Sequence, residues 1–305
     1  MPDGSVVVAG EALVDLVLAA DGSLAAHPGG GPYNVARTIG RLEQPVAYLG
    51  RLSTDGFGER LRKGLQDAGV SVDTVVATDA PTTLALAELD RTGAACYRFY
   101  ESGTSAPGLT LQAASAALPQ LVGTFYLGTL GLVFEPMAST LEALVGRIDG
   151  DTLVALDPNY RPSAIADPAA FRGRLAGLLG RTDVMKASVE DLAWIEPGAN
   201  PVTAARGLLG QDHAVALVTL GSDGAHVITK HEAIEVSAPK VEVVDSIGAG
   251  DAFMGAFLAD WHRRGLGRAE LGRLDELEQA VAFACRVAAI TCARAGADPP
   301  RLAEL

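Results

Sequence analysis

A carboxylate follows directly behind a glycine-rich turn in the segment VVDSIGAGDAFMGAFLAD. Asp251 comes after Gly248, Ala249 and Gly250, with an apolar run before them and a helical pattern after them. Glycines let backbone N–H groups converge on an anion, and the positive end of a helix strengthens the attraction. A carboxylate at the rim of such a cradle is placed to accept a proton from a hydroxyl that attacks phosphorus. The segment is therefore suited to phosphoryl transfer, with Asp251 as the base and the three preceding residues holding anionic charge.

Two familiar phosphate motifs do not describe this segment. The Walker pattern G-x-x-x-x-G-K-[ST] is absent, and Phe253 takes the place of the third glycine in G-x-G-x-x-G. Taken alone, the four letters GAGD fit a helix cap behind a glycine turn better than a catalytic base. The rest of the sequence has to decide between the two interpretations.

Composition narrows the class of protein. The 305 residues are 49% hydrophobic, enough for one large domain or a large and a small one. The 24 Lys and Arg against 37 Asp and Glu give a net charge of -13, which disfavours a nucleic-acid partner.

Three cysteines without a C-x-x-C pair and an N-terminus without a basic, apolar leader predict a reducing, cytoplasmic location. The uncharged stretch 102–134 is broken by prolines and glycines, so no membrane segment is expected.

Elements that must position Asp251 can be read from the hydrophobic pattern. Runs that are apolar on both faces, typical of central parallel strands, occur at 6–10, 46–50, 124–128, 152–157 and 214–221. Helical patterns occur between and after several of them, at 33–42, 57–68, 139–148, 169–179 and 202–209. This alternation predicts an α/β, doubly wound, mostly parallel sheet flanked by helices. Two long helices are expected after Asp251.

Two regions break the alternation, at about 15–29 and 72–103. The second contains VDTVVATD, TTLALAELD and ACYRFYE in succession, which favour antiparallel strands with short turns. We expect the two regions to form a small antiparallel β lid over a single domain that spans 1–305. The alternative is an antiparallel edge of the main sheet.

Two segments together resemble the signatures of the PfkB (ribokinase-like) carbohydrate kinases. DSIGAGD at 245–251 is similar to the family pattern D-T-x-G-A-G-D, and GGGPYNVA at 29–36 looks like the element G-G-x-x-x-N-x-A. The resemblance extends from GEALVD near the start to the last residues. It implies a ribokinase-like fold and an ATP-dependent sugar kinase, a phosphotransferase that moves the γ-phosphate of ATP to a sugar hydroxyl.

The resemblance also implies a set of residues that bind the sugar. Asp15 corresponds to the sugar-binding aspartate of the family, and a carboxylate is a good acceptor for vicinal hydroxyls. The glycine-rich element adds Gly29, Gly30 and Asn34. Arg98 and Arg161 are expected near the sugar or the transferring phosphate, the alternative being surface ion pairs.

Nucleotide-binding residues follow from two further matches. TLGSDG resembles the family loop T-L-G-x-x-G and implies ATP contacts from Thr219, Gly221, Ser222 and Gly224, although a simple hairpin turn has the same pattern. In KASVEDL, Ser188 and Asp191 take the places of the family motif N-x-x-E. Ser188 is accordingly assigned to the nucleotide, and Asp191 to Mg²⁺ through water.

A monovalent cation, K⁺, is a further implication of the resemblance. The loop 291–296 is similar to one that encloses such an ion through backbone carbonyls, together with Asp245. The implied positions in this loop are Thr291, Arg294 and Gly296. Pro300 stands where some members have a serine ligand.

Fructose is the expected substrate, phosphorylated to fructose 6-phosphate. DPNYR, KASVEDLAWI and YRFYESGT are all similar to segments of fructokinase-like members. Alternatives within the family are kinases of 2-keto-3-deoxygluconate, ribose or a nucleoside, and outside it a catalytically silent sugar-binding protein. The resemblance also suggests a homodimer formed through the lid.

Overall fold

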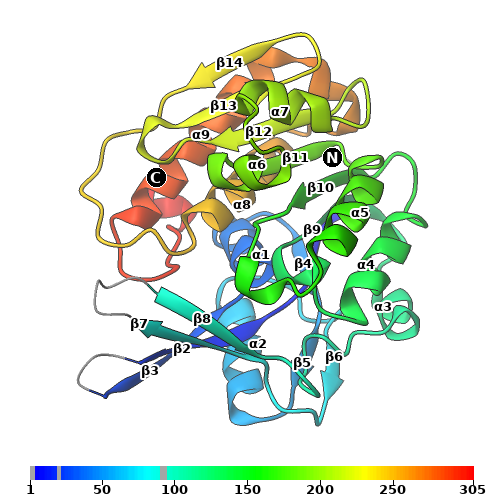
Figure 1. Ribbon diagram of the computed structural model, residues 1–305, viewed down its shortest axis with the longest axis vertical. Coiled ribbons are helices and arrows are strands. Elements are labelled where there is room, and N and C mark those ends of the chain that lie inside the picture. Colours follow the sequence, from blue (N-terminus) through cyan, green and yellow to red (C-terminus); the bar gives the residue numbers. More distant parts are fainter. Residues whose placement is uncertain (1–3, 19–21, 90–94) are drawn as a thin grey trace.

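The main sheet runs through the middle of the molecule. The computed structural model describes residues 4–18, 22–89 and 95–305, and within them this sheet has eight strands (Figure 1). From one edge to the other they are β14 (Ala233–Val236), β13 (Ala225–Ile228), β12 (Val215–Thr219), β11 (Val184–Ser188), β10 (Leu153–Asp157), β9 (Val122–Gly128), β1 (Ser5–Ala9) and β4 (Val46–Leu49). The six from β12 to β4 are parallel, and β13 and β14 are antiparallel to their neighbours. The α/β prediction is confirmed.

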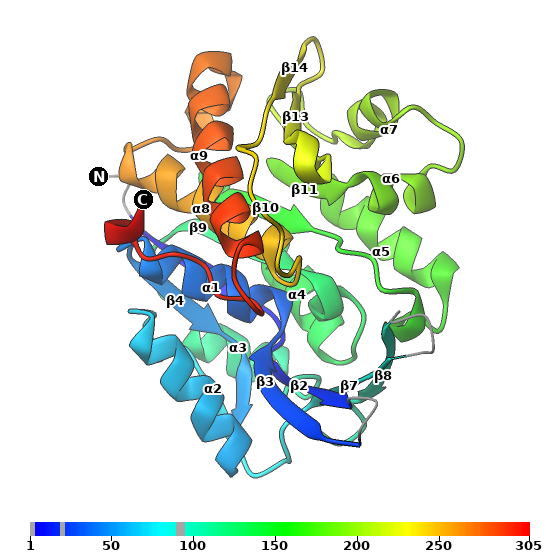
Figure 2. The same cartoon turned by 90° about the vertical axis from the view of Figure 1, so that its left-hand side faces the viewer.

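Helices cover both faces of this sheet, because its central strands are apolar on both sides. One face carries α1 (Gly31–Arg41), α2 (Gly56–Asp67), α8 (Ala249–Arg263) and α9 (Leu274–Cys292). The other carries α3 (Leu111–Ala117), α4 (Met137–Val145), α5 (Pro168–Leu179), α6 (Val189–Ile195) and α7 (Pro201–Leu208). In Figure 2, α8 and α9 lie left of the sheet and α5 to α7 right of it. Among the helices of the described residues, none combines the length and apolarity needed to cross a membrane.

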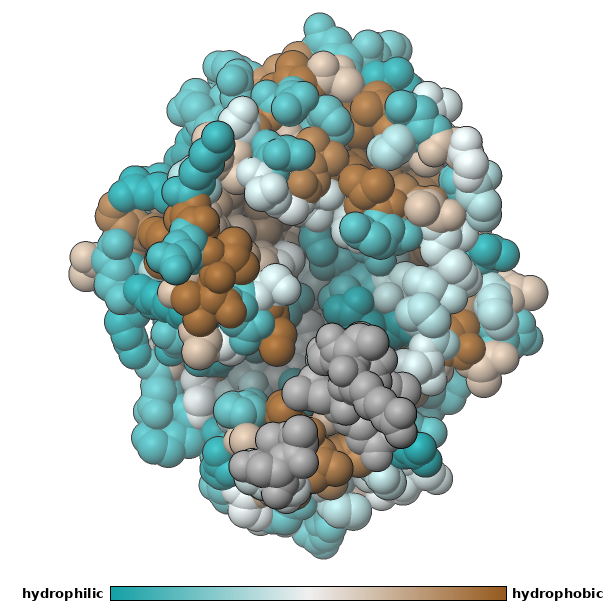
Figure 3. Space-filling view, turned by 60° about the vertical axis from the view of Figure 1, so that its left-hand side comes forward, coloured by the Kyte–Doolittle hydropathy of each residue, from teal (hydrophilic) through white to brown (hydrophobic). Residues whose placement is uncertain are grey.

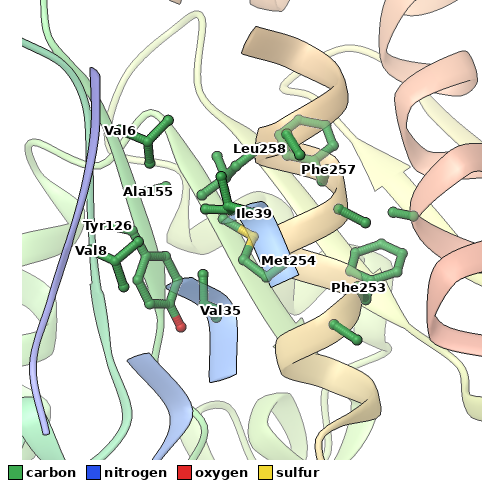
Figure 4. Close-up of a cluster of buried hydrophobic side chains, with 14 of the residues drawn as sticks. Val6, Val8, Val35, Ile39, Tyr126, Ala155, Phe253, Met254, Phe257 and Leu258 are labelled. Carbon is green, nitrogen blue, oxygen red and sulfur yellow. The ribbon is translucent and has the colours of Figure 1, made fainter. Parts of the chain in front are cut away.

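Alternate residues of each strand enter alternate layers of the core. Val6 and Val8 of β1 contact the cluster under α1 and α8, whereas Val7 belongs to the opposite cluster. Figure 4 shows the first cluster, where Ile39 and Met254 bring α1 and α8 together against the sheet. Burial of these side chains fixes the first turns of α1 and α8 close to one another.

A second sheet, of four strands, is built from two separate parts of the chain. Its order is β3 (Leu24–Gly29), β2 (Leu13–Leu18), β7 (Leu84–Leu89) and β8 (Ala95–Tyr100). The pairs β2–β3 and β7–β8 are antiparallel, but β2 and β7 are parallel, so the sheet is mixed. It is separate from the main sheet and lies below it in Figure 1. A role as a lid stays a prediction.

The expectation for residues 72–79 is wrong in one respect. The strand found there, β6 (Val76–Thr78), does not join the four-stranded sheet, but pairs in parallel with β5 (Arg51–Ser53) in a two-stranded sheet. The segment that follows β4 runs alongside β6, and the Val76 N–H donates to the Gly50 carbonyl, so β6 finds its partner there. Alternation within a short strand does not reveal its partner.

Candidate active site

A cavity of about 330 Å³ opens at the carboxyl ends of the central parallel strands. In the sheet β1 has β4 on one side and β9 on the other, so the strand order reverses at β1. Ligands of open α/β sheets bind at such a point. Tyr97 and Phe99 of β8 close the cavity from the four-stranded sheet. Figure 3 shows a hollow with a hydrophilic floor near the middle of this face.

Residues predicted from far-apart segments meet in this cavity. Its wall includes Asp15, Gly30, Asn34, Arg161, Gly248, Gly250 and Asp251. Gly29 does not face the cavity but makes room behind Asp15, because a β-carbon there would lie 2.0 Å from Asp15 Oδ2. Arg98 is exposed and lines a neighbouring cavity with Glu101 and other residues instead.

Asp251 belongs to the first turn of α8 without capping it. The N-cap is Gly248, and no side chain caps this helix end. The Asp251 carboxylate accepts a 2.9 Å hydrogen bond from Asn34 Nδ2, across 217 positions of sequence. Burial raises the pKa of Asp251, against the opposing effects of this hydrogen bond and of the charges of Lys186 and Arg161. A buried carboxylate with a raised pKa is suited to act as a general base.

The turn before Asp251 needs glycine for two reasons. Gly248 has φ +75°, a left-handed conformation, and a β-carbon there would lie 2.5 Å from that of Ala297. A β-carbon on Gly250 would lie 2.9 Å from Lys186 Nζ. The Ala249 N–H donates to the Ser246 carbonyl at 3.3 Å. The N–H groups of Gly250 and Asp251 belong to the first helical turn, where such groups lack partners within the helix and can hold an anion.

The predicted nucleotide residues do not line this cavity, but they also lie at the carboxyl ends of the parallel strands. Thr219 ends β12 and Ser188 ends β11. The residues after Thr219 form a hairpin turn, with Gly221 at φ +62° and Gly224 at φ +110°. At Gly224 a β-carbon would lie 2.0 Å from the Val236 carbonyl oxygen. The hairpin and the predicted ATP loop are therefore one feature, and nucleotide binding there stays a prediction.

The carboxylate predicted to act through water on Mg²⁺ has other partners. Asp191 accepts hydrogen bonds from the backbone N–H and hydroxyl of Ser188, both at 2.8 Å, and from the Tyr160 N–H at 2.7 Å. It thus joins the start of α6 to the loop after β10. Across the described ranges, no group of three or more His, Cys, Asp or Glu side chains is arranged to hold a metal.

Asp245 bridges the two loops of the predicted K⁺ site. Its carboxylate accepts the Ile247 N–H at 3.0 Å and the Gly296 N–H at 2.8 Å. The Thr291 hydroxyl donates to its own helix, and the Arg294 guanidinium pairs with Asp298 and Glu304. The backbone carbonyls of this loop as cation ligands, and the cation itself, stay predictions.

Glu11 is a member of the cavity wall that the sequence analysis missed. It is fully buried, and its carboxylate accepts the Gly31 N–H at 3.1 Å and the Gly131 N–H at 2.9 Å. It therefore ties the start of α1 to the turn after β9. Burial raises the pKa of Glu11 to about 8. A signal was present, because Glu11 is the second residue of the GEALVD motif that contains Asp15.

Lys186 of the cavity wall, also missed, forms a buried ion pair at 2.9 Å with Asp157, which lies behind the wall. Beside it, Thr129 and Asn159 line the cavity with left-handed backbones, at φ +55° and +37°. The Asn159 amide donates to the Thr129 hydroxyl at 3.3 Å. Such conformations are uncommon outside glycine and concentrate at functional sites. DPNYR and KASVEDL contain three of these four residues, but nothing in the sequence marks Thr129.

Known proteins resemble this chain in sequence and in overall fold. The profile of the pfkB family of carbohydrate kinases matches residues 3–303. A fructokinase of Rhizobium leguminosarum bv. trifolii is 31% identical over 261 residues, which is 83% of this chain and 78% of the relative.

Solved structures of similar proteins share the fold. Fructokinase from Xylella fastidiosa with bound ATP superposes with a TM-score of 0.87 at 28% identity, over 96% of this chain and 93% of that one. Fructokinase from Vibrio cholerae O395, bound to fructose, ADP and calcium ion, gives 0.85 at 25% identity, over 96% and 94%. The fold is accordingly ribokinase-like.

Proposed function

The chain belongs to the pfkB family of carbohydrate kinases, and from this we propose that it uses ATP to phosphorylate fructose to fructose 6-phosphate. The observation that carries the proposal is the pairing of Asp251 with Asn34 at the cavity wall, next to the glycine turn of α8. The relatives' names support fructose as the sugar.

In this mechanism the sugar lies between Asp15, Asn34 and Asp251. Asp251 takes the proton of the sugar hydroxyl as its oxygen forms a bond to the γ-phosphorus. The bond from that phosphorus to the β,γ-bridging oxygen breaks, and ADP leaves with the electron pair. N–H groups of the first turn of α8 stabilise the charge that develops on the phosphoryl oxygens.

Magnesium, the cytoplasmic location, the homodimer and the lid are parts of the proposal that rest on the family. Mg²⁺ neutralises charge on the phosphates of ATP. Asp191, whose carboxylate is hydrogen-bonded by Ser188 and Tyr160, would contact such an ion through water and not directly.

A sugar panel tests the proposed function. We expect ADP release with ATP and Mg²⁺ to be fastest, by kcat/KM, with D-fructose, and the product to carry its phosphate on the 6-hydroxyl by ³¹P NMR. A higher kcat/KM with 2-keto-3-deoxygluconate, ribose or a nucleoside would assign the site to that substrate. No turnover with any sugar, together with a sugar-dependent rise in Tm, would indicate a silent binding protein.

Sugar binding should depend on pH through Asp15. Burial, and then the charge of Asp251, raise the pKa of Asp15 to about 6, against the effect of Arg161. Below pH 6 the carboxyl is protonated and becomes a poorer acceptor for sugar hydroxyls. We therefore expect KM for fructose to rise as the pH falls from 7.5 to 5, measured by steady-state kinetics.

The matched variant is Asp15→Asn. It should raise KM at every pH and flatten this part of the profile, since no titrating group remains at the position. A KM for the unaltered protein that is constant between pH 7.5 and 5 would argue against Asp15 as a sugar ligand.

A further inference from the structure

Lys186 is a buried cation in the wall of the active-site cavity. It is 4% exposed, although lysine is rarely buried to this extent. Its Nζ lies beside Gly250, where a β-carbon would be only 2.9 Å away. It therefore lies next to the turn of α8, whose Gly248, Gly250 and Asp251 line the cavity.

Asp157 fixes the position of this ammonium group. Its Oδ2 accepts from Lys186 Nζ at 2.9 Å, and its Oδ1 accepts the Asn159 N–H at 3.1 Å. Burial alone would lower the pKa of Lys186, but the nearby carboxylates of Asp157 and Asp191 raise it, so the ammonium keeps its proton. An ammonium has three donors, and Asp157 is the one hydrogen-bond partner of Nζ found among the residues that the structure describes.

The other charges of the cavity make this cation necessary. Glu11, Asp15 and Asp251 are acidic, and Arg161 is the remaining basic side chain of the lining, but it is exposed. A triphosphate brought against the carboxylates of Asp15 and Asp251 needs positive charge that is fixed in place and shielded from water. Lys186 meets both conditions.

We propose that the Lys186 ammonium contacts the γ-phosphoryl group during its transfer and is a catalytic residue held in place by Asp157. This rests on the proposed kinase function. Lys186 keeps its proton throughout, since the sugar proton goes to Asp251 and the electron pair of the broken bond leaves with ADP. Its contribution is to attract the phosphoryl oxygens more strongly as their charge is redistributed in the transition state.

The test separates this role from simple neutralisation of Asp157. Lys186→Met alone leaves a buried, unpaired carboxylate and is expected to destabilise the fold. The double variant Lys186→Met/Asp157→Asn removes both charges and should remain folded by circular dichroism and thermal unfolding. We expect its kcat with fructose to be lower by about 100-fold or more at every pH from 6 to 9.

The matched control is Lys230→Met/Asp212→Asn. This pair is also a lysine with an aspartate, at 2.7 Å. However, Asp212 precedes β12 and Lys230 follows β13, so the pair lies at the amino ends of the parallel strands, away from the cavity. Its kcat should equal that of the unaltered protein.

Three results would overturn the inference. Near-normal kcat in the double variant would make Lys186 a structural partner of Asp157. Recovery at high pH alone would mean that Lys186 acts by keeping Asp251 ionised. Absence of turnover by the unaltered protein with every sugar would remove the proposed function and this inference with it.

Discussion

Asp251→Asn should lower kcat by at least about 100-fold, the range attributed to a general base, while KM for fructose and ATP changes little. The asparagine retains an oxygen that can accept the Asn34 hydrogen bond, which is 2.9 Å long in the native protein, so the geometry of the wall is preserved. What the variant loses is the ability to take the proton from the sugar. Steady-state kinetics with saturating ATP and Mg²⁺ measure the effect.

Thermal unfolding provides the control for this variant. An asparagine in place of a buried carboxyl should leave Tm unchanged or raised, because burial disfavours the charged form that is removed. A kcat within fivefold of normal in the folded variant would eliminate Asp251 as the base.

Gly248→Ala should lower kcat by about tenfold or more without unfolding the protein, since displaced anion-hole donors cost this much or more. The substitution strains a backbone at φ +75° and drives a methyl group to 2.5 Å from the Ala297 β-carbon. Either the loop 296–299 or the turn of α8 must move, and both determine where the N–H groups of that turn point. Kinetics and thermal unfolding should be measured together.

Gly265→Ala is the matched substitution. Gly265 follows α8 at its other end, has φ +69°, and has open space where a β-carbon would lie. It should lose about 1 kcal/mol of stability from backbone strain alone, with kcat unchanged. If Gly248→Ala behaves in the same way, the contact with Ala297 has no importance for catalysis.

The sequence predicted those parts of the molecule whose information is local. VVVAG and AVALVTLG are apolar on both faces, and the structure places them in β1 and β12. The 3.6-residue pattern likewise predicted α1 and α8 to within a few residues. GAGD became informative only in combination with the other signatures, since its four residues also describe a helix cap.

What the sequence did not predict depends on contacts between distant segments. Glu11 is buried because α1 and the turn after β9 close over it, and its place in GEALVD beside Asp15 is the one sign of it in the sequence. Lys186 looks like an ordinary polar residue in a strand until Asp157 is placed beside it in register. Strand pairing has the same limitation, as the parallel contact of β2 with β7 and the separate pairing of β6 illustrate.

The hydrogen bond between Asn34 and Asp251 has a consequence for synthesis of the protein. Asn34 is synthesised early, and Asp251 follows only 217 residues later. The loop that packs on Gly248 comes later still, and Arg37 of α1 holds it through the Ala297 carbonyl. The kinase site therefore cannot form on the ribosome before the loop that contains Ala297 has been made.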